Sequence, residues 1–168
     1  MSGKFLGQNG PTFDTGPDSA RRSFPGGKRF AYVSEDALEI EEERHNGSVL
    51  FIHGTGAKAL TLPKMPKIGF TVELLVWEAV SGGNLTVTSA DADELYFGAL
   101  ESVVAAGTQS VFLPDGSDDR ILTWNGSTFG GLKGSHVWFT YVAPRSGIGQ
   151  WLVEGRAVAS GSVATPFS

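Results

Sequence analysis

Hydrophobic and polar residues alternate in short segments along most of the chain after Gly47, a spacing typical of β-strands with one buried face. The clearest segment spans residues 70–80. Its first face carries Phe70, Val72, Leu74 and Val76, and its second face carries Thr71, Glu73, Leu75 and Trp77. The first face is predicted to enter the core, and Leu75 and Trp77 would then be apolar side chains on the outer side of a sheet.

Further strand segments recur at regular spacing, and the first of them is a continuous apolar run. They are Ser48–His53, Ala59–Leu62, Asn84–Ser89, Leu95–Gly98, Gln109–Leu113, Arg120–Trp124, Val137–Ala143 and Gln150–Val158. Asn125-Gly126 carries the residues of a two-residue hairpin turn, whereas Ala99–Ala106 allows a helical turn. Nine or ten short strands predict an all-β fold, an antiparallel β-sandwich or a barrel-like domain, with Leu85 and Val87 pointing inward.

The segment Ser34–Asn46 precedes these strands and is strongly acidic. Its acids are Glu35, Asp36, Glu39, Glu41, Glu42 and Glu43. It fits a short helix capped by Ser34, and equally an edge strand with Leu38 and Ile40 on one face.

Residues 1–33 differ from the rest of the chain and are predicted to form an extended N-terminal arm, with the β-domain spanning 34–168. The arm is rich in Gly, Pro and Ser, follows neither the strand nor the helix period, and cannot form a core of its own. Residues 1–34 contain five basic and two acidic residues and therefore carry a charge of +3. Because the net charge of the whole chain is −5, the remaining residues carry a charge of −8. The dispersed phenylalanines suggest anchors for another surface.

Composition restricts the possible functions. The chain of 168 residues has no cysteine, which excludes disulfides, thiolate metal sites and thiol catalysis. Its net charge of −5 argues against nucleic-acid binding. No apolar run is long enough to span a membrane, and Met1–Gly10 lacks the apolar block of a secretory signal. We therefore expect a protein made in a cytoplasm, with no nucleic-acid or membrane partner.

Motifs for catalysis and cofactor binding are weak. Gly54-x-Gly56 follows a strand, but Pro63 and Pro66 prevent the helix that a phosphate-binding loop requires. His45 and His53 are eight residues apart, which fits no metal pair on a helix. We therefore predict no catalytic residues, no cofactor and no metal site.

Two acidic loops leave calcium as an open question. One contains Asp91, Asp93 and Glu94, and the other contains Asp115, Asp118 and Asp119. Their oxygens suit calcium, but neither has the spacing of an EF-hand, and aspartates are also ordinary turn residues.

Several sequence features, taken in order, resemble the small β-domains of capsid decoration, or head cement, proteins of tailed bacteriophages. After the acidic segment and Asn46-Gly47 these are Leu60-Thr61-Leu62-Pro63-x-x-Pro66, Gly69-Phe70-Thr71-Val72, Gly82-Gly83-Asn84-Leu85-Thr86-Val87, Ser110-Val111-Phe112-Leu113, Trp151-Leu152-Val153-Glu154-Gly155 and Ala164-Thr165-Pro166-Phe167. The resemblance covers about residues 36–168, and related β-domains occur in phage tail and fibre proteins.

The resemblance implies a non-enzymatic virion protein, a homotrimer that binds the major capsid protein on the outer capsid surface and stabilises the assembled head. In this interpretation the arm contacts the capsid through Phe5, Phe13, Arg21, Arg22, Phe24, Lys28 and Arg29. The trimer interface would use Leu75, Trp77 and Trp138. The alternative is a tail- or fibre-associated module that binds a receptor glycan, with some of Trp77, Trp124, Trp138 and Trp151 as a sugar-stacking platform; core or subunit contacts are the more ordinary use of such tryptophans.

Overall fold

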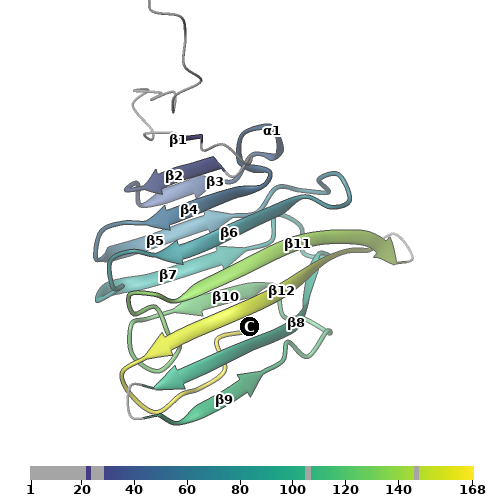
Figure 1. Ribbon diagram of the computed structural model, residues 1–168. Coiled ribbons are helices and arrows are strands. Elements are labelled where there is room, and N and C mark those ends of the chain that lie inside the picture. Colours follow the sequence, from purple (N-terminus) through teal and green to yellow (C-terminus); the bar gives the residue numbers. More distant parts are fainter. Residues whose placement is uncertain (1–21, 24–28, 105–106, 146–147) are drawn as a thin grey trace, which may run out of the picture.

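The computed structural model describes residues 22–23, 29–104, 107–145 and 148–168, whose strands form two β-sheets packed face to face (Figure 1). The larger sheet has the order β1-β2-β4-β6-β11-β12-β8-β9 and the smaller sheet the order β10-β7-β5-β3. The strands of the larger sheet are β1 (Arg22–Ser23), β2 (Arg29–Val33), β4 (Ser48–Ile52), β6 (Thr71–Val76), β8 (Leu95–Val104), β9 (Gln109–Phe112), β11 (His136–Arg145) and β12 (Ile148–Ala159). Those of the smaller sheet are β3 (Ala37–Glu39), β5 (Gly56–Thr61), β7 (Gly82–Thr88) and β10 (Ile121–Trp124).

One hydrophobic core fills the space between the sheets. Alternate residues of the strands point into it, as the period of two requires. Phe70, just before β6, and Val72, Leu74 and Val76 of β6 are each at most 1% exposed. Leu85 and Val87 of β7 are buried, as predicted. The largest fully buried side chains include Trp124, Trp151, Tyr96, Phe70 and Phe139.

The first half of the domain is a flattened coil. From β2 to β7 the chain passes alternately between the two sheets, so β2, β4 and β6 stack in parallel in one sheet while β3, β5 and β7 stack in parallel in the other. The turns between these strands cross from sheet to sheet instead of reversing within one sheet. The expectation of an antiparallel sandwich is therefore wrong for this half, and the fold is a mixed two-sheet sandwich.

The second half adds antiparallel pairs. β11 lies antiparallel to β6, and β11 and β12 form a long hairpin. β12 is parallel to β8, which pairs with β9 at the edge of the sheet. The C-terminal residues complete the smaller sheet, since Ile121 N–H donates to Ser168 O and Thr123 N–H to Pro166 O along the free side of β10.

Two local expectations about turns are corrected. Asn125-Gly126 forms no hairpin: Asn125 Oδ1 accepts the N–H groups of Ser127 and Phe129, and the chain leaves β10 for the other sheet. The possible helical turn in Ala99–Ala106 is wrong for residues 99–104, which continue β8.

The acidic segment contains both structures that were left open. β3 comes first, and the four-residue helix α1 (Glu42–His45) follows it. Ser34 does not cap this helix, which begins after Glu41. Residues 29–33, grouped with the arm on composition, form β2, and Val33 lies in the core.

Candidate functional site: an aromatic face on the larger sheet

Large apolar side chains gather on the outer side of the larger sheet. The aromatic face consists of Phe30, Tyr32, Phe51, Leu75, Trp77 and Trp138, which come from β2, β4, β6, the residue after β6, and β11. These positions alternate with core residues, so each strand that buries one face presents the other outward. The register places Tyr32, Phe51, Leu75 and His136 in one row across four adjacent strands.

Ring contacts join four residues of this face, Phe30, Tyr32, Phe51 and Trp77, into one cluster. Phe51 lies at its centre, with ring centroids 5.5 Å from Phe30, 5.4 Å from Tyr32 and 5.9 Å from Trp77. The first two contacts are stacked, and the third is edge-to-face. Lys133 Nζ lies 4.7 Å from the centroid of Trp77, within the range of a cation–π interaction. These contacts hold the rings in a fixed arrangement before any partner binds.

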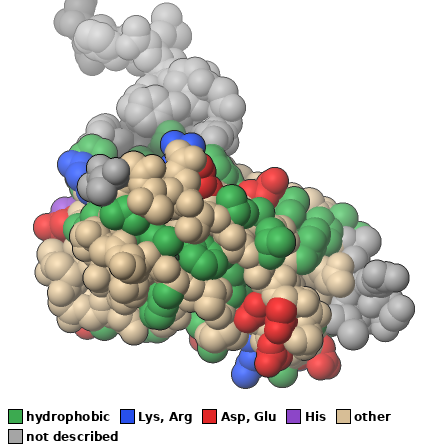
Figure 2. Space-filling model, turned by 90° about the horizontal axis from the view of Figure 1, so that it is seen from below, with side chains coloured by type: hydrophobic (Ala, Val, Ile, Leu, Met, Phe, Trp, Pro, Cys, Tyr) green, Lys and Arg blue, Asp and Glu red, His purple; other side chains and the backbone are tan. Residues whose placement is uncertain are grey.

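Solvent reaches a large part of this surface. Trp77 is 49% exposed, and Tyr32 and Trp138 are each 37% exposed. Scattered single apolar residues are ordinary on protein surfaces, whereas contiguous aromatic patches mark contact sites. Figure 2 shows the molecule from below relative to Figure 1, and on that side hydrophobic side chains and a group of acidic side chains both lie at the surface.

Charged residues border the aromatic face. Trp138 lies between Glu73 of β6 and Glu154 of β12 in the strand register, and its ring meets that of His136 edge-to-face at 4.7 Å. Further along β12, Arg156 pairs with Glu101 of β8 at 2.7 Å. The face is thus an apolar centre with a polar rim, the usual composition of a protein interface.

The structure brings all three residues of the predicted trimer interface onto this face, since Leu75, Trp77 and Trp138 share the outer side of the larger sheet. Sequence reasoning missed Tyr32 and Phe51 and placed Phe30 in the arm. Residues 29–33 have the composition of the arm, and residues 48–52 contain a continuous apolar run, so neither segment distinguishes a buried face from an outer one in the sequence. Trp124 and Trp151 lie in the core and cannot stack on a sugar.

The predicted capsid-contact residues lie mostly outside the described part of the chain. Phe5, Phe13, Arg21, Phe24 and Lys28 are not described, and of Arg22 only the backbone is, paired in register with Phe30. Arg29 is exposed on β2, where its Nη1 donates to Glu43 O at 3.4 Å.

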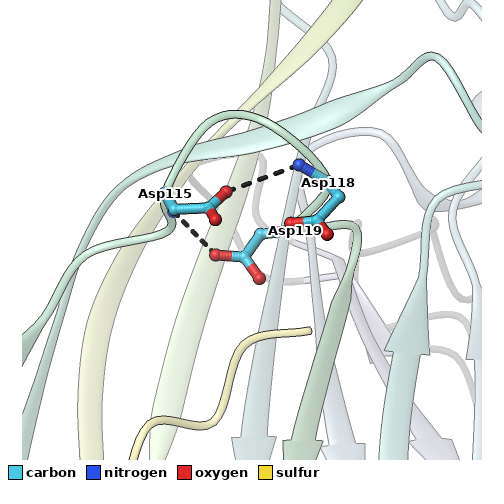
Figure 3. A group of neighbouring side chains, drawn as sticks. All are labelled: Asp115, Asp118 and Asp119. Carbon is cyan, nitrogen blue, oxygen red and sulfur yellow. Dashed lines mark hydrogen bonds between the residues drawn. The ribbon is translucent and has the colours of Figure 1, made fainter.

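The second acidic loop brings its three carboxylates together, with one oxygen from each of Asp115, Asp118 and Asp119 within 4.8 Å of the others (Figure 3). Local hydrogen bonds account for this arrangement. Asp119 Oδ2 accepts the N–H of Asp115, and Asp115 Oδ1 accepts the N–H and the hydroxyl of Ser117. The hydrogen bonds from Ser117 also lower the pKa of Asp115. The cluster is a stable turn, as Asx-type loops are.

The three carboxylates of the first acidic loop have separate roles. Lys64 forms a 2.7 Å ion pair with Asp91; the hydrogen bond between them lowers the pKa of Asp91 and raises that of Lys64. Glu94 is buried and accepts hydrogen bonds from Met65 N–H and Trp151 Nε1, which ties the loop before β6 to β12. Asp93 N–H donates to Asp91 Oδ1 within the loop.

The histidines lie in unrelated places. His53 is exposed after β4, and its Nδ1 lies 3.6 Å from Glu78 Oε2. The same Glu78 oxygen accepts a hydrogen bond from the N–H of Gly54. His45 is buried in α1, where its Nδ1 accepts the N–H of Glu41. His136 lies at the start of β11 beside the aromatic face.

No protein-family model matches the chain, and a search of curated proteins gives no significant match. Among the described residues, no helix has the length and apolar character needed to cross a membrane.

Proposed function

We propose that this protein is a virion structural protein that binds the outer surface of a tailed-phage capsid and stabilises the assembled head. The aromatic face is the observation that carries the proposal. A two-sheet domain with a preassembled apolar surface and a basic N-terminal segment is suited to adhesion at more than one place. The proposed location on a virion is supported by the order of sequence features that resembles phage decoration domains.

The mechanism is mass action on the assembled lattice. A protein that binds only the mature capsid stabilises it by RT ln(1 + [L]/Kd) at each site. In this proposal three copies associate through the aromatic face, and the trimer presents three arms to neighbouring capsid subunits. Linking the arms raises the effective concentration of the second and third contacts once the first has formed.

Binding to purified capsids tests this proposal. The full chain should saturate expanded, assembled capsids of its phage, and it should leave soluble capsid subunits unbound. Coated capsids should release their genome at a higher temperature than bare ones. Equal release temperatures, or absence of binding to assembled capsids, would overturn the assignment.

One observation favours a second candidate, a receptor-binding module that recognises glycans. Exposed Trp138, with Glu73 and Glu154 on the neighbouring strands, has the elements of a sugar site, an aromatic platform beside carboxylates. A glycan array distinguishes the two candidates. If the protein is a receptor-binding module, the wild type should bind a specific oligosaccharide on the array and the Trp138→Ala variant should not, and neither should bind capsids.

A further inference from the structure

A second apolar surface lies on the larger sheet, around the strand β9 at the opposite end of the strand order from β2. The β9 patch consists of Phe97 of β8, Val111 of β9 and Leu113, the residue after β9. These side chains are 36%, 64% and 67% exposed. Val111 and Leu113 flank Phe112, which packs against the core, so the alternation along the strand turns both of them outward. Figure 2 views the molecule from the side on which β9 lies in Figure 1.

The strand register places the β9 patch on the same side of the sheet as the aromatic face. Val111 lies opposite Glu101 of β8, which lies opposite Arg156 of β12. Arg156 in turn lies opposite His136 of β11, which belongs to the row of Leu75 in the aromatic face. Residues directly opposite one another in neighbouring strands share one side of a sheet. The outer side therefore carries two apolar surfaces with charged residues, including the Glu101–Arg156 ion pair, between them.

Acidic groups border the β9 patch. The acidic turn that follows Leu113 contains Asp115, Asp118 and Asp119, and one carboxylate oxygen from each lies within 4.8 Å of the others. Among the described residues, none of these carboxylates forms an ion pair with a cationic side chain. Like charges at this separation repel one another, and a cation from outside the turn would relieve the repulsion.

A cation borders the aromatic face. Lys133 Nζ lies 4.7 Å from the centroid of the Trp77 ring, and in the part of the chain that the structure describes Lys133 forms no ion pair. The acid next to Trp77, Glu78, accepts the N–H of Gly54 at 2.8 Å. The two surfaces are therefore complementary, because one has an apolar ring beside a cation and the other has apolar side chains beside carboxylates.

We propose that the β9 patch binds the aromatic face of a second copy of this chain, so that Trp77 and Lys133 of one copy contact Leu113 and the acidic turn of the next. The inference rests on the trimer of the proposed function. Copies around a threefold axis meet through two different surfaces, whereas one self-complementary surface gives a twofold dimer. A trimer therefore needs a partner surface for the aromatic face, and the β9 patch supplies both apolar side chains and the opposite charge.

Mixing two variants tests the pairing of the surfaces. Trp77→Ser with Trp138→Ser disables the aromatic face, and Val111→Ser with Leu113→Ser disables the β9 patch. Each variant alone should sediment as a monomer at a micromolar concentration at which the wild type is a trimer. An equimolar mixture retains one intact aromatic face and one intact β9 patch, so it should form a 1:1 heterodimer that cannot close into a ring.

An exchange of charges tests the same contact without removing apolar groups. Lys133→Glu and Asp118→Lys should each weaken self-association about tenfold, because each places like charges across the contact. The double variant should return to within about twofold of the wild type, since its charges are again opposite. If Val111→Ser with Leu113→Ser does not fold by circular dichroism, the charge exchange decides alone.

The control variant is Met65→Ser with Ile68→Ser, whose side chains are similarly exposed, at 59% and 68%, but lie between β5 and β6. It should remain trimeric. A folded β9-patch variant that stays trimeric, a mixture of folded variants that stays monomeric, or a double charge variant as weak as the single ones would overturn the inference. A wild-type dimer with the same complementation would support the pairing and overturn the trimer. Capsid binding by the full chain reports on the proposed function separately.

Discussion

The two exposed tryptophans of the aromatic face allow a quantitative test of self-association. The double variant Trp77→Ser with Trp138→Ser removes the two largest exposed apolar groups from the face and leaves the core untouched. A tryptophan presents about 250 Å². Exposures of 49% and 37% therefore leave about 120 and 90 Å² open to solvent, or about 210 Å² in each protomer.

Burying this area at about 25 cal/mol per Å² would contribute at most about 5 kcal/mol per protomer. Interfaces recover only part of such area because side chains are ordered and polar groups are desolvated on binding. Taking half of the area term gives about 2–3 kcal/mol, which weakens association about 30- to 150-fold per interface. At micromolar concentration we expect the wild type to sediment as a trimer and the double variant mainly as a monomer.

The matched control is Met65→Ser with Ile68→Ser. These side chains are 59% and 68% exposed, but they lie in the loop between β5 and β6, away from the aromatic face. The control should remain trimeric, and circular dichroism should show that all three proteins are folded at the temperature of the experiment. A monomeric wild type, or a control that dissociates as readily as the double variant, would refute the role given to the face.

Three further predictions concern the interior of the domain. The hydroxyl of Tyr96 donates to Val87 O at 3.0 Å, whereas the buried hydroxyl of Tyr141 has no hydrogen-bond partner in the described residues. Tyr96→Phe should therefore lower the free energy of unfolding, measured in urea, by about 1 kcal/mol, and Tyr141→Phe should lower it by less than about half of that. Burial, and secondarily Glu94, raises the pKa of both tyrosines, so the folded state holds these protons more tightly than the unfolded state. The contribution of the two tyrosines to stability should therefore be constant below about pH 10 and fall above it, and a flat stability profile from about pH 9 to 11 would contradict this. Gly155→Ala should lower the melting temperature strongly, because a Cβ there would lie 2.3 Å from His136 O in the adjacent strand, whereas Gly161→Ala, whose Cβ meets only Ser127 Oγ at 3.5 Å, should leave it nearly unchanged.

The sequence predicts the strands well because alternation is a local property. The segments expected at 48–53, 70–80 and 150–158 contain β4, β6 and most of β12, and the face of Leu75 and Trp77 follows from the alternation in β6 alone. Strand pairing is not local. The turn after β4 contains Gly54, and Ser81-Gly82-Gly83 has the composition of a hairpin turn. Yet the chain crosses between sheets at both places, and Gly82 and Gly83 already belong to β7. The residue types therefore do not reveal the parallel stacking of alternate strands. The hairpin expected at Asn125 fails for this reason, since Asn and Gly also suit the wide turn that Asn125 Oδ1 caps.

The aromatic face shows the same limit. Each strand contributes an outward residue that is ordinary by itself, and only the register of β2, β4, β6 and β11 places Tyr32, Phe51, Leu75 and His136 in one row, with Trp138 two residues further along β11.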